Sequence, residues 1–242
     1  MSRILLEVCV ADAESLDAAI EGGADRIELC SALELGGLTP SPGLMRYASR
    51  APIPVYAMIR PRSGDFVFSE PEAEIMLADI DSVRRAGLAG VVLGASRRDG
   101  RLDIDLLSRL SDAGHGLGKS LHRAFDLVPD IADAVNTAIL LGFERILTSG
   151  RAATAAEGID DLARTERIAA GRISIMPGSG IGPQTIGLLA ERLSPHEVHA
   201  SCAAPVAQHS QAVRFGFAQP TRRLTSVESV RALRQTLDAL AL

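Results

Sequence analysis

Two short apolar stretches of the sequence each carry a carboxylate and a thiol two residues apart. Glu7 and Cys9 lie in the first stretch, and Glu28 and Cys30 lie in the second. Residues at this spacing project from the same face of a β-strand. Because a carboxylate inside an apolar strand is costly to bury without a partner, its presence in two successive strands predicts a shared polar pocket.

Other apolar stretches also end in groups that can bind charge or move protons. Arg60 is a natural guanidinium partner for the two glutamates. His122 alternates with Asp126 onto one strand face, and His199 does the same with Ser201. The candidate catalytic groups are Glu7, Glu28, Arg60, His122, Asp126 and His199. A lone strand histidine is more often a core group, but this convergent set predicts a functional pocket in which His122 or a glutamate acts as general acid or base.

Two glycine-containing segments are candidates for binding an anion. Glycines after a strand can present backbone N–H groups to a phosphate or carboxylate, and a helix expected to begin near Gly182 would add its positive end. A tight turn is the plain alternative. The candidate anion-binding residues are Thr148, Ser149, Gly150, Gly178, Ser179, Gly180 and Ser201.

Cys9 and Cys30 are expected on adjacent parallel strands, which run about 4.8 Å apart. One soft ion such as Cu(I) would then bridge two thiolates. The alternative is two reduced core cysteines that behave as small apolar groups, and residue chemistry alone slightly favours it. A zinc site is only weakly supported, because no Cys-x-x-Cys or His-x-x-x-His spacing occurs.

These residues lie in a regular alternation of strands and helices. The expected strands are 4–10, 26–30, 54–60, 89–94, 119–125, 145–149, 172–177 and 196–202. The expected helices are 12–22, 41–50, 70–86, 103–114, 129–142, 154–170, 182–192 and 226–241. Eight such units of about 30 residues predict an α/β fold, a single-domain (β/α)8 TIM barrel over residues 1–242. A doubly wound open sheet is the alternative, and segment 203–223 is expected to be a long polar loop.

Composition excludes several classes of protein. Aromatic residues make up 3% of the 242 residues and the net charge is −5, so neither a stacking platform nor a basic surface for nucleic acid is expected. The first residues lack a signal-peptide apolar segment, and no apolar run is long enough to span a membrane. With three cysteines in apolar strands, the sequence favours a reducing cytoplasm.

Taken together, these motifs resemble the CutC family of copper homeostasis proteins. The matching segments are Leu6-Glu7-Val8-Cys9, 23–30, 36–41, 59–62, Gly64-Asp65-Phe66, 122–126, 147–150 and His199-Ala200-Ser201. The resemblance implies a (β/α)8 barrel, a cytoplasmic setting, a homo-oligomer, and copper binding through Cys9 and Cys30. Two departures are Ser63, where the family usually has glycine, and segment 203–223, which matches poorly.

The sequence supports two alternative functions. The family resemblance favours a Cu(I)-binding copper homeostasis protein that uses Cys9 and Cys30. The many acid–base groups favour an enzyme instead, a lyase, isomerase or hydrolase acting on a small anionic metabolite, because a Cu(I) carrier needs thiols and little else.

Overall fold

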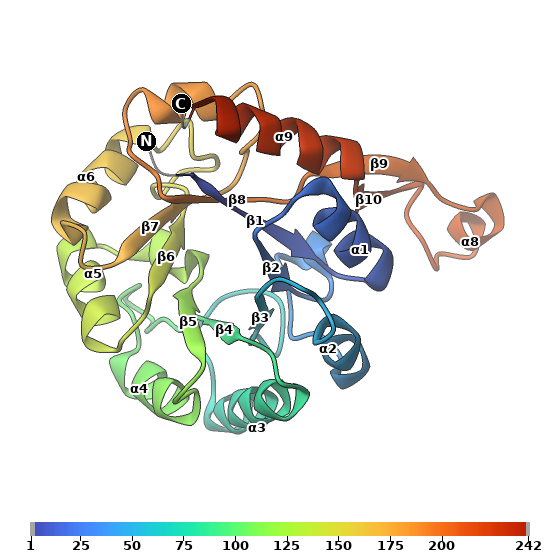
Figure 1. The fold of residues 1–242 in the computed structure, drawn as a ribbon. Helices are drawn as coiled ribbons and strands as arrows, with labels where there is room; N and C mark the ends of the chain where they lie inside the picture. The colour runs from blue at the N-terminus through green and yellow to red at the C-terminus, as the bar shows by residue number, and fades with distance from the viewer. Residues whose placement is uncertain (1–2, 241–242) are drawn as a thin grey trace.

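The computed structural model describes residues 3–240, and its centre is a ring of parallel strands (Figure 1). The strands of this ring are β1 Leu5–Val10, β2 Arg26–Leu29, β3 Val55–Met58, β4 Gly90–Leu93, β5 Gly118–Leu121, β6 Arg145–Thr148, β7 Ser174–Pro177 and β8 Glu197–Ala200. All eight match predicted strands, although several end earlier than expected, most of all β5.

Helices alternate with the strands and form the outer layer (Figure 1). They are α1 Ala13–Gly22, α2 Pro42–Ala48, α3 Glu70–Ala86, α4 Ile104–Ala113, α5 Ile131–Leu140, α6 Ile159–Ala169, α7 Ile186–Ala190 and α9 Val227–Leu240. Short 3-10 helices η1 Leu33–Leu35 and η2 Arg123–Leu127 follow β2 and β5. The final residue of the expected helix 226–241 lies outside the described residues. Among residues 3–240 the search for a helix able to cross a membrane finds none.

The strand order closes the sheet into a barrel. The order is β7-β6-β5-β4-β3-β2-β1-β8. The last strand of the ring, β8, thus pairs in parallel with the first, β1. β7 and β8 also lie in contact, so the ring is nearly closed. A doubly wound sheet would keep its first strand in the middle and leave two edges, so the (β/α)8 prediction is confirmed.

Local sequence explains where helices begin and end. The Asp12 side chain accepts a hydrogen bond from Ser15 N at the start of α1. Ser69 and Glu72 form a capping box at the start of α3, and that helix ends at Gly87, whose φ of 76° is left-handed. These signals fix the lengths of the helices and therefore the positions of the strands between them.

The strands separate two chemically different layers, one between the strands and the helices and one inside the barrel. Leu6, Val8 and Val10 of β1 belong to an extensive apolar core shared with the helices. The barrel interior holds a small apolar group, Cys30, Tyr56, Met58 and Val92, beside many buried charged residues. Glu7, Glu28 and His199 therefore face an interior that is polar and largely shielded from water.

The segment after β8 is not the polar loop that the sequence predicts. It forms β9 Ala203–Ala207, α8 Ser210–Arg214 and β10 Thr221–Thr225, with β9 and β10 antiparallel. We call residues 203–225 the arm. The arm projects beyond α1, to the right in Figure 1. The two strands of this hairpin are short and largely exposed, so the composition of the segment resembles that of a loop and does not predict them.

Candidate functional site

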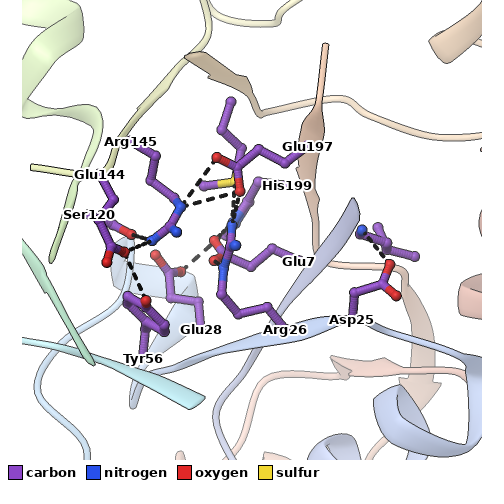
Figure 2. A network of polar contacts seen from close by, with 12 residues as sticks. Glu7, Asp25, Arg26, Glu28, Tyr56, Ser120, Glu144, Arg145, Glu197 and His199 are labelled. Atoms are coloured by element: carbon purple, nitrogen blue, oxygen red, sulfur yellow. Dashed lines mark hydrogen bonds and ion pairs between the residues drawn. The ribbon is translucent and has the colours of Figure 1, made fainter. Parts of the chain in front are cut away.

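A network of buried charges lies inside the barrel (Figure 2). Arg26 lies between two carboxylates. It donates from Nε to Glu7, and from Nη2 to Glu197 over 2.5 Å. All three side chains are almost fully buried. Burial alone would raise the Glu7 pKa, but Arg26 and His199 outweigh it and lower that pKa to about 2. Glu7 is therefore an ionised group held by two cations.

Arg145 completes the network on the opposite side of the barrel. It donates to Glu197 over 3.2 Å and to Ser120 Oγ over 2.9 Å, and its guanidinium lies 4.9 Å from the centre of the Tyr56 ring. Tyr56 fits because its neighbours are glycines: a Cβ added at Gly118 would lie 2.1 Å from the Tyr56 hydroxyl oxygen. This layer closes the N-terminal part of the interior with mutually paired groups.

His199 connects this network to Glu28 and Cys9, which lie closer to the C-terminal ends of their strands. Its Nδ1 lies 2.8 Å from Glu7 Oε1, and its Nε2 lies 3.8 Å from Glu28 Oε2. Burial disfavours the imidazolium, but Glu28, Cys9 and Glu7 outweigh this and raise the His199 pKa well above its usual value. Burial, together with the charge of Glu7, raises the pKa of Glu28. The pair Glu28–His199 can therefore exchange a proton while Glu7 holds the ring in place. Both glutamates of the first two strands thus lie beside His199.

Cys9, Glu28 and His199 form a group of metal-donor atoms. One donor atom of each lies within 4.8 Å of the other two. The sheet register places Cys9 opposite Glu28, not opposite Cys30 as expected for two paired thiols. Cys30 lies beyond them, with Sγ 3.5 Å from Glu28 Oε2, and burial raises its pKa well above the ordinary value. Cys9 thus belongs to a mixed sulfur, nitrogen and oxygen group and does not face Cys30 directly across the strands, because the register offsets the two cysteines by two residues.

Arg60 does not pair with the glutamates, which corrects the sequence-based prediction. Its guanidinium donates to the carbonyl oxygens of Leu35, Gly37 and Gly64, at 3.0, 3.2 and 2.7 Å. It also lies over the Phe66 ring, 4.8 Å from its centre. Arg60 therefore holds the loops after β2 and β3 in place. Arg26, not Arg60, is the guanidinium partner of Glu7.

His122 is buried near the end of β5 and lacks one hydrogen bond. Its Nδ1 accepts from Ala124 N over 3.1 Å, so the neutral ring carries its proton on Nε2. That Nε2 has no partner among the described residues, and neither does Glu28 Oε1. Burial and the charge of Arg60 lower the His122 pKa to about 3. His122 is therefore a neutral ring with a proton to donate.

Asp126 does not share a strand face with His122, because the chain turns into η2 directly after β5. Its carboxylate instead accepts from Thr148 Oγ1 over 2.5 Å, from the N–H groups of Ser149 and Arg151, and from Arg123 Nε over 2.7 Å. The expected alternation is wrong because His122 caps a 3-10 turn rather than continuing the strand. Asp126 holds the loop after β6.

The two loops of the candidate anion site lie side by side, as predicted. Gly178 N donates to Thr148 O over 3.0 Å, and Ser179 Oγ donates to Ala153 O over 2.8 Å. The hydroxyl groups of Thr148 and Ser149 are bound to Asp126. The helix expected near Gly182 begins at Ile186 instead, since Thr185 Oγ1 accepts from Gly182 N and keeps this segment a turn. Ser201 lies exposed after β8.

Sequence reasoning missed the lower charged layer, although a signal was present. Arg26 and Glu197 precede Glu28 and His199 by two residues, so they lie on the same strand faces. The sequence-based prediction rests on strand ends, because active sites of such barrels lie there. Extending the alternation one step toward the start of β2 and β8 finds Arg26 and Glu197, whereas Arg145 lies three residues before Thr148 and is not reached by this step.

The fold and the site together define a (β/α)8 barrel protein with a buried acid–base and thiol cluster in its interior. A model of the CutC family matches residues 4–204. A CutC family protein of Rhizobium meliloti (strain 1021) is 60% identical over 242 residues, covering 100% of this chain and 99% of the relative. One of Caulobacter vibrioides (strain NA1000 / CB15N) is 51% identical over 239 residues, covering 96% and 98%. The chain therefore belongs to the CutC family.

Solved structures agree with this assignment. A protein of Streptococcus agalactiae, provisionally described as the copper homeostasis protein CutC, superposes with a TM-score of 0.78 at 30% identity, covering 82% of this chain and 98% of that one. Thiamine phosphate pyrophosphorylase from Pyrococcus furiosus, at 13% identity and a TM-score of 0.61, shares the fold alone; it covers 98% of this chain and 96% of that one. The family match ends at residue 204, where the arm begins, in keeping with the poor match noted for segment 203–223.

Proposed function

We propose that the protein binds Cu(I) inside the barrel through Cys9, with His199 and Cys30 completing the site. The observation that carries this proposal is the set of donor atoms of Cys9, Glu28 and His199 within 4.8 Å of one another. Thiolate and imidazole ligands suit Cu(I), and the S. agalactiae relative is described as a copper homeostasis protein.

The surroundings of His199 fit a metal ligand. Its Nδ1 faces Glu7 at 2.8 Å, the arrangement in which a carboxylate orients a ligating histidine. Its Nε2 faces Cys9 and Glu28, so that nitrogen is the one that would meet the ion. The raised pKa of His199 means that a proton must leave when the ion enters. Affinity should therefore increase with pH.

Competition with a colorimetric Cu(I) chelator under reducing conditions tests the proposal. We expect about one equivalent bound to the wild type, strong loss in Cys9→Ser, and loss of intermediate size in Cys30→Ser. Cys202→Ser, which removes a cysteine outside the proposed donor set, should change affinity little. Equal affinity of the wild type and the Cys9→Ser/Cys30→Ser double variant would refute the site.

A second candidate function is an enzyme that moves a proton next to a carbonyl group of a small anionic metabolite. The observation that favours it is the pair of buried, unsatisfied groups, His122 Nε2 and Glu28 Oε1. A neutral histidine can polarise a carbonyl oxygen, and a carboxylate with a raised pKa can take up the proton. His199 would stabilise the carboxylate form of Glu28 before it takes up the proton, and Glu7 would hold the His199 ring in place.

Hydrogen–deuterium exchange into small carbonyl compounds tests this function. Pyruvate and dihydroxyacetone phosphate, incubated in D2O with the metal-free protein, should lose C–H signals in proton NMR faster than with buffer alone. Glu28→Gln should abolish the effect, while Glu34→Gln, a change outside the cluster, should preserve it. Exchange that is equal in the wild type and Glu28→Gln would count against the enzyme.

We also propose that the protein works in the cytoplasm as a homo-oligomer. The three cysteines are free, which suits a reducing compartment. Self-association is supported by the arm, where Phe217 is 85% exposed. The arm carries Arg214, Arg222 and Arg223 and no acidic residue. A groove of about 420 Å³ between α1 and α2, lined by Leu16, Ile20 and Tyr47 with Asp17, Glu21 and Arg50, offers a mainly apolar surface for the arm on a second copy.

Sedimentation measures this association. Phe217→Ser should shift the wild-type oligomer toward monomer, whereas Leu140→Ser, at a residue that is 79% exposed on α5, should not. A wild type that sediments as a monomer at all concentrations would end the proposal. So would an oligomer that is unaffected by Phe217→Ser.

A further inference from the structure

A cavity of about 550 Å³ opens at the C-terminal end of the barrel, outside the charged interior. Its walls come from the loops after β3 and β4 and from Leu127 at the end of η2. Three consecutive strands therefore contribute to it. This is the face on which barrels of this kind place their ligands. None of the residues assigned to the copper site lines this cavity.

The walls are held in place by bonds between loops. Ser96 N donates to Phe66 O over 2.8 Å, which ties the loop after β4 to the loop after β3. Gly100 packs against Leu127, where an added Cβ would lie 2.8 Å from the carbonyl oxygen, and its φ of +84° is left-handed. Arg62 is fixed by Glu72 and by the Val67 carbonyl oxygen. The cavity is therefore preformed rather than a gap between mobile loops.

Two hydrogen-bonding groups of this cavity have no partner among residues 3–240. Ser96 is only 3% exposed, and its Oγ makes no hydrogen bond. A buried hydroxyl group without a partner is costly, so such a group calls for an explanation. Arg98 also lines the cavity, and its guanidinium forms no hydrogen bond or ion pair with the described residues. Its neighbour Arg97, by contrast, is paired with Asp105 at 2.8 Å.

The rest of the wall has a charged part, formed by Arg97 and by Asp65 paired with Arg62, and an apolar part. Phe66, Val67 and Leu127 line it, and Leu127 is more than half exposed there. The Phe66 ring is shared with the barrel interior, because its centre lies 4.8 Å from that of His122. The cavity thus combines Arg98, which is unpaired within residues 3–240, with one buried hydroxyl group, an apolar face and the Asp65 carboxylate, which Arg62 neutralises at 2.9 Å.

We propose that this cavity binds a small organic anion, a carboxylate or phosphate carried on an apolar body. The charged end meets the Arg98 guanidinium and the Ser96 hydroxyl group, and the apolar body lies on Phe66 and Leu127. A guanidinium and a hydroxyl group are suitable donors for either anion. The site depends on neither the copper site nor the enzyme proposed above.

Calorimetric titration with phenyl phosphate, using the metal-free full-length protein, tests the site. We expect one equivalent to bind, and Arg98→Gln to weaken binding by about tenfold or more, because a charge-assisted hydrogen bond is lost. The matched control is Arg46→Gln, which removes an exposed arginine of α2 outside the cavity. Leu127→Ser should weaken binding of phenyl phosphate and leave that of inorganic phosphate unchanged.

Several results would overturn the proposal. These are no binding to the wild type, equal loss in Arg98→Gln and Arg46→Gln, or inorganic phosphate binding as tightly as phenyl phosphate. Cys9→Ser should bind phenyl phosphate as the wild type does. Loss of phenyl phosphate binding in that variant would place the ligand in the interior instead and would also overturn the assignment.

Discussion

Removing Arg26 should leave two carboxylates uncompensated inside the barrel. Arg26 donates to both Glu7 and Glu197, and all three side chains are almost fully buried. The interactions of Glu7 lower its pKa from 4.5 to about 2. At about 1.36 kcal/mol per pH unit, this difference corresponds to a contribution of about 3 kcal/mol to the free energy of unfolding. Breaking a buried ion pair by removing one partner costs roughly 3–5 kcal/mol, in agreement with this figure.

The assay is thermal unfolding of Arg26→Met beside Arg85→Met. For a chain of this length each kcal/mol shifts Tm by roughly 2–4 °C, so we expect Arg26→Met to melt roughly 6–20 °C below the wild type at pH 7. Arg85→Met breaks an exposed pair with Asp81, at 2.9 Å, and should cost at most about 1 kcal/mol.

The pH dependence gives a second check on the same reasoning. Glu7 has a depressed pKa in the folded state, so its contribution is complete above pH 4.5 and is lost as the pH falls toward 2. The gap between wild type and Arg26→Met should therefore narrow over that range. Adding Glu7→Gln to Arg26→Met should restore part of the stability. Equal melting temperatures at pH 7, or a double variant less stable than Arg26→Met, would refute the argument.

Two further predictions concern the end of the barrel where the strands finish. Gly100→Ala should lower the denaturant concentration at the unfolding midpoint more than Gly116→Ala does. Both glycines have φ above +80°, but only at Gly100 would an added Cβ meet a neighbour, the Leu127 carbonyl oxygen at 2.8 Å. Equal effects of the two substitutions would contradict this prediction. His122 should stay neutral in nitrogen NMR spectra from pH 7 to pH 4, since burial and Arg60 lower its pKa to about 3, and a titration near pH 6.5 would show that the ring is solvated. Because the unfolded chain takes up this proton near pH 6.5, His122 should also make stability fall as the pH drops below that value.

The alternation of apolar stretches predicted the fold because its period is a local property of each segment. Every strand of the barrel lies at a predicted position, and the 70–86 helix was placed with its correct ends. The arm was missed for a related reason. Its strands are exposed on both sides, so burial does not impose an alternating pattern on residues 203–225.

Side-chain partners were harder to predict, because they depend on register between strands. Which residue of β2 lies beside Cys9 is set by the stagger of the barrel, and that stagger puts Glu28 there. Arg60 was assigned to the glutamates because its charge fits, but its guanidinium reaches carbonyl oxygens of its own loops. Neither choice leaves a trace in the local sequence, since Glu28 lies 19 residues from Cys9 and Leu35 lies 25 residues from Arg60 along the chain.

The two proposed functions use the same atoms and can be separated for that reason. A Cu(I) ion held by Cys9 and His199 Nε2 would replace the proton that His199 exchanges with Glu28, at a nitrogen–oxygen separation of 3.8 Å. One equivalent of Cu(I) should therefore stop deuterium exchange into a carbonyl substrate if both functions belong to this cluster. The Cys9→Ser variant should keep exchanging in the presence of copper, because its site for the ion is gone. If instead copper binds to the wild type while exchange continues unchanged, the ion lies elsewhere and the cluster of Glu7, Glu28 and His199 serves proton transfer alone.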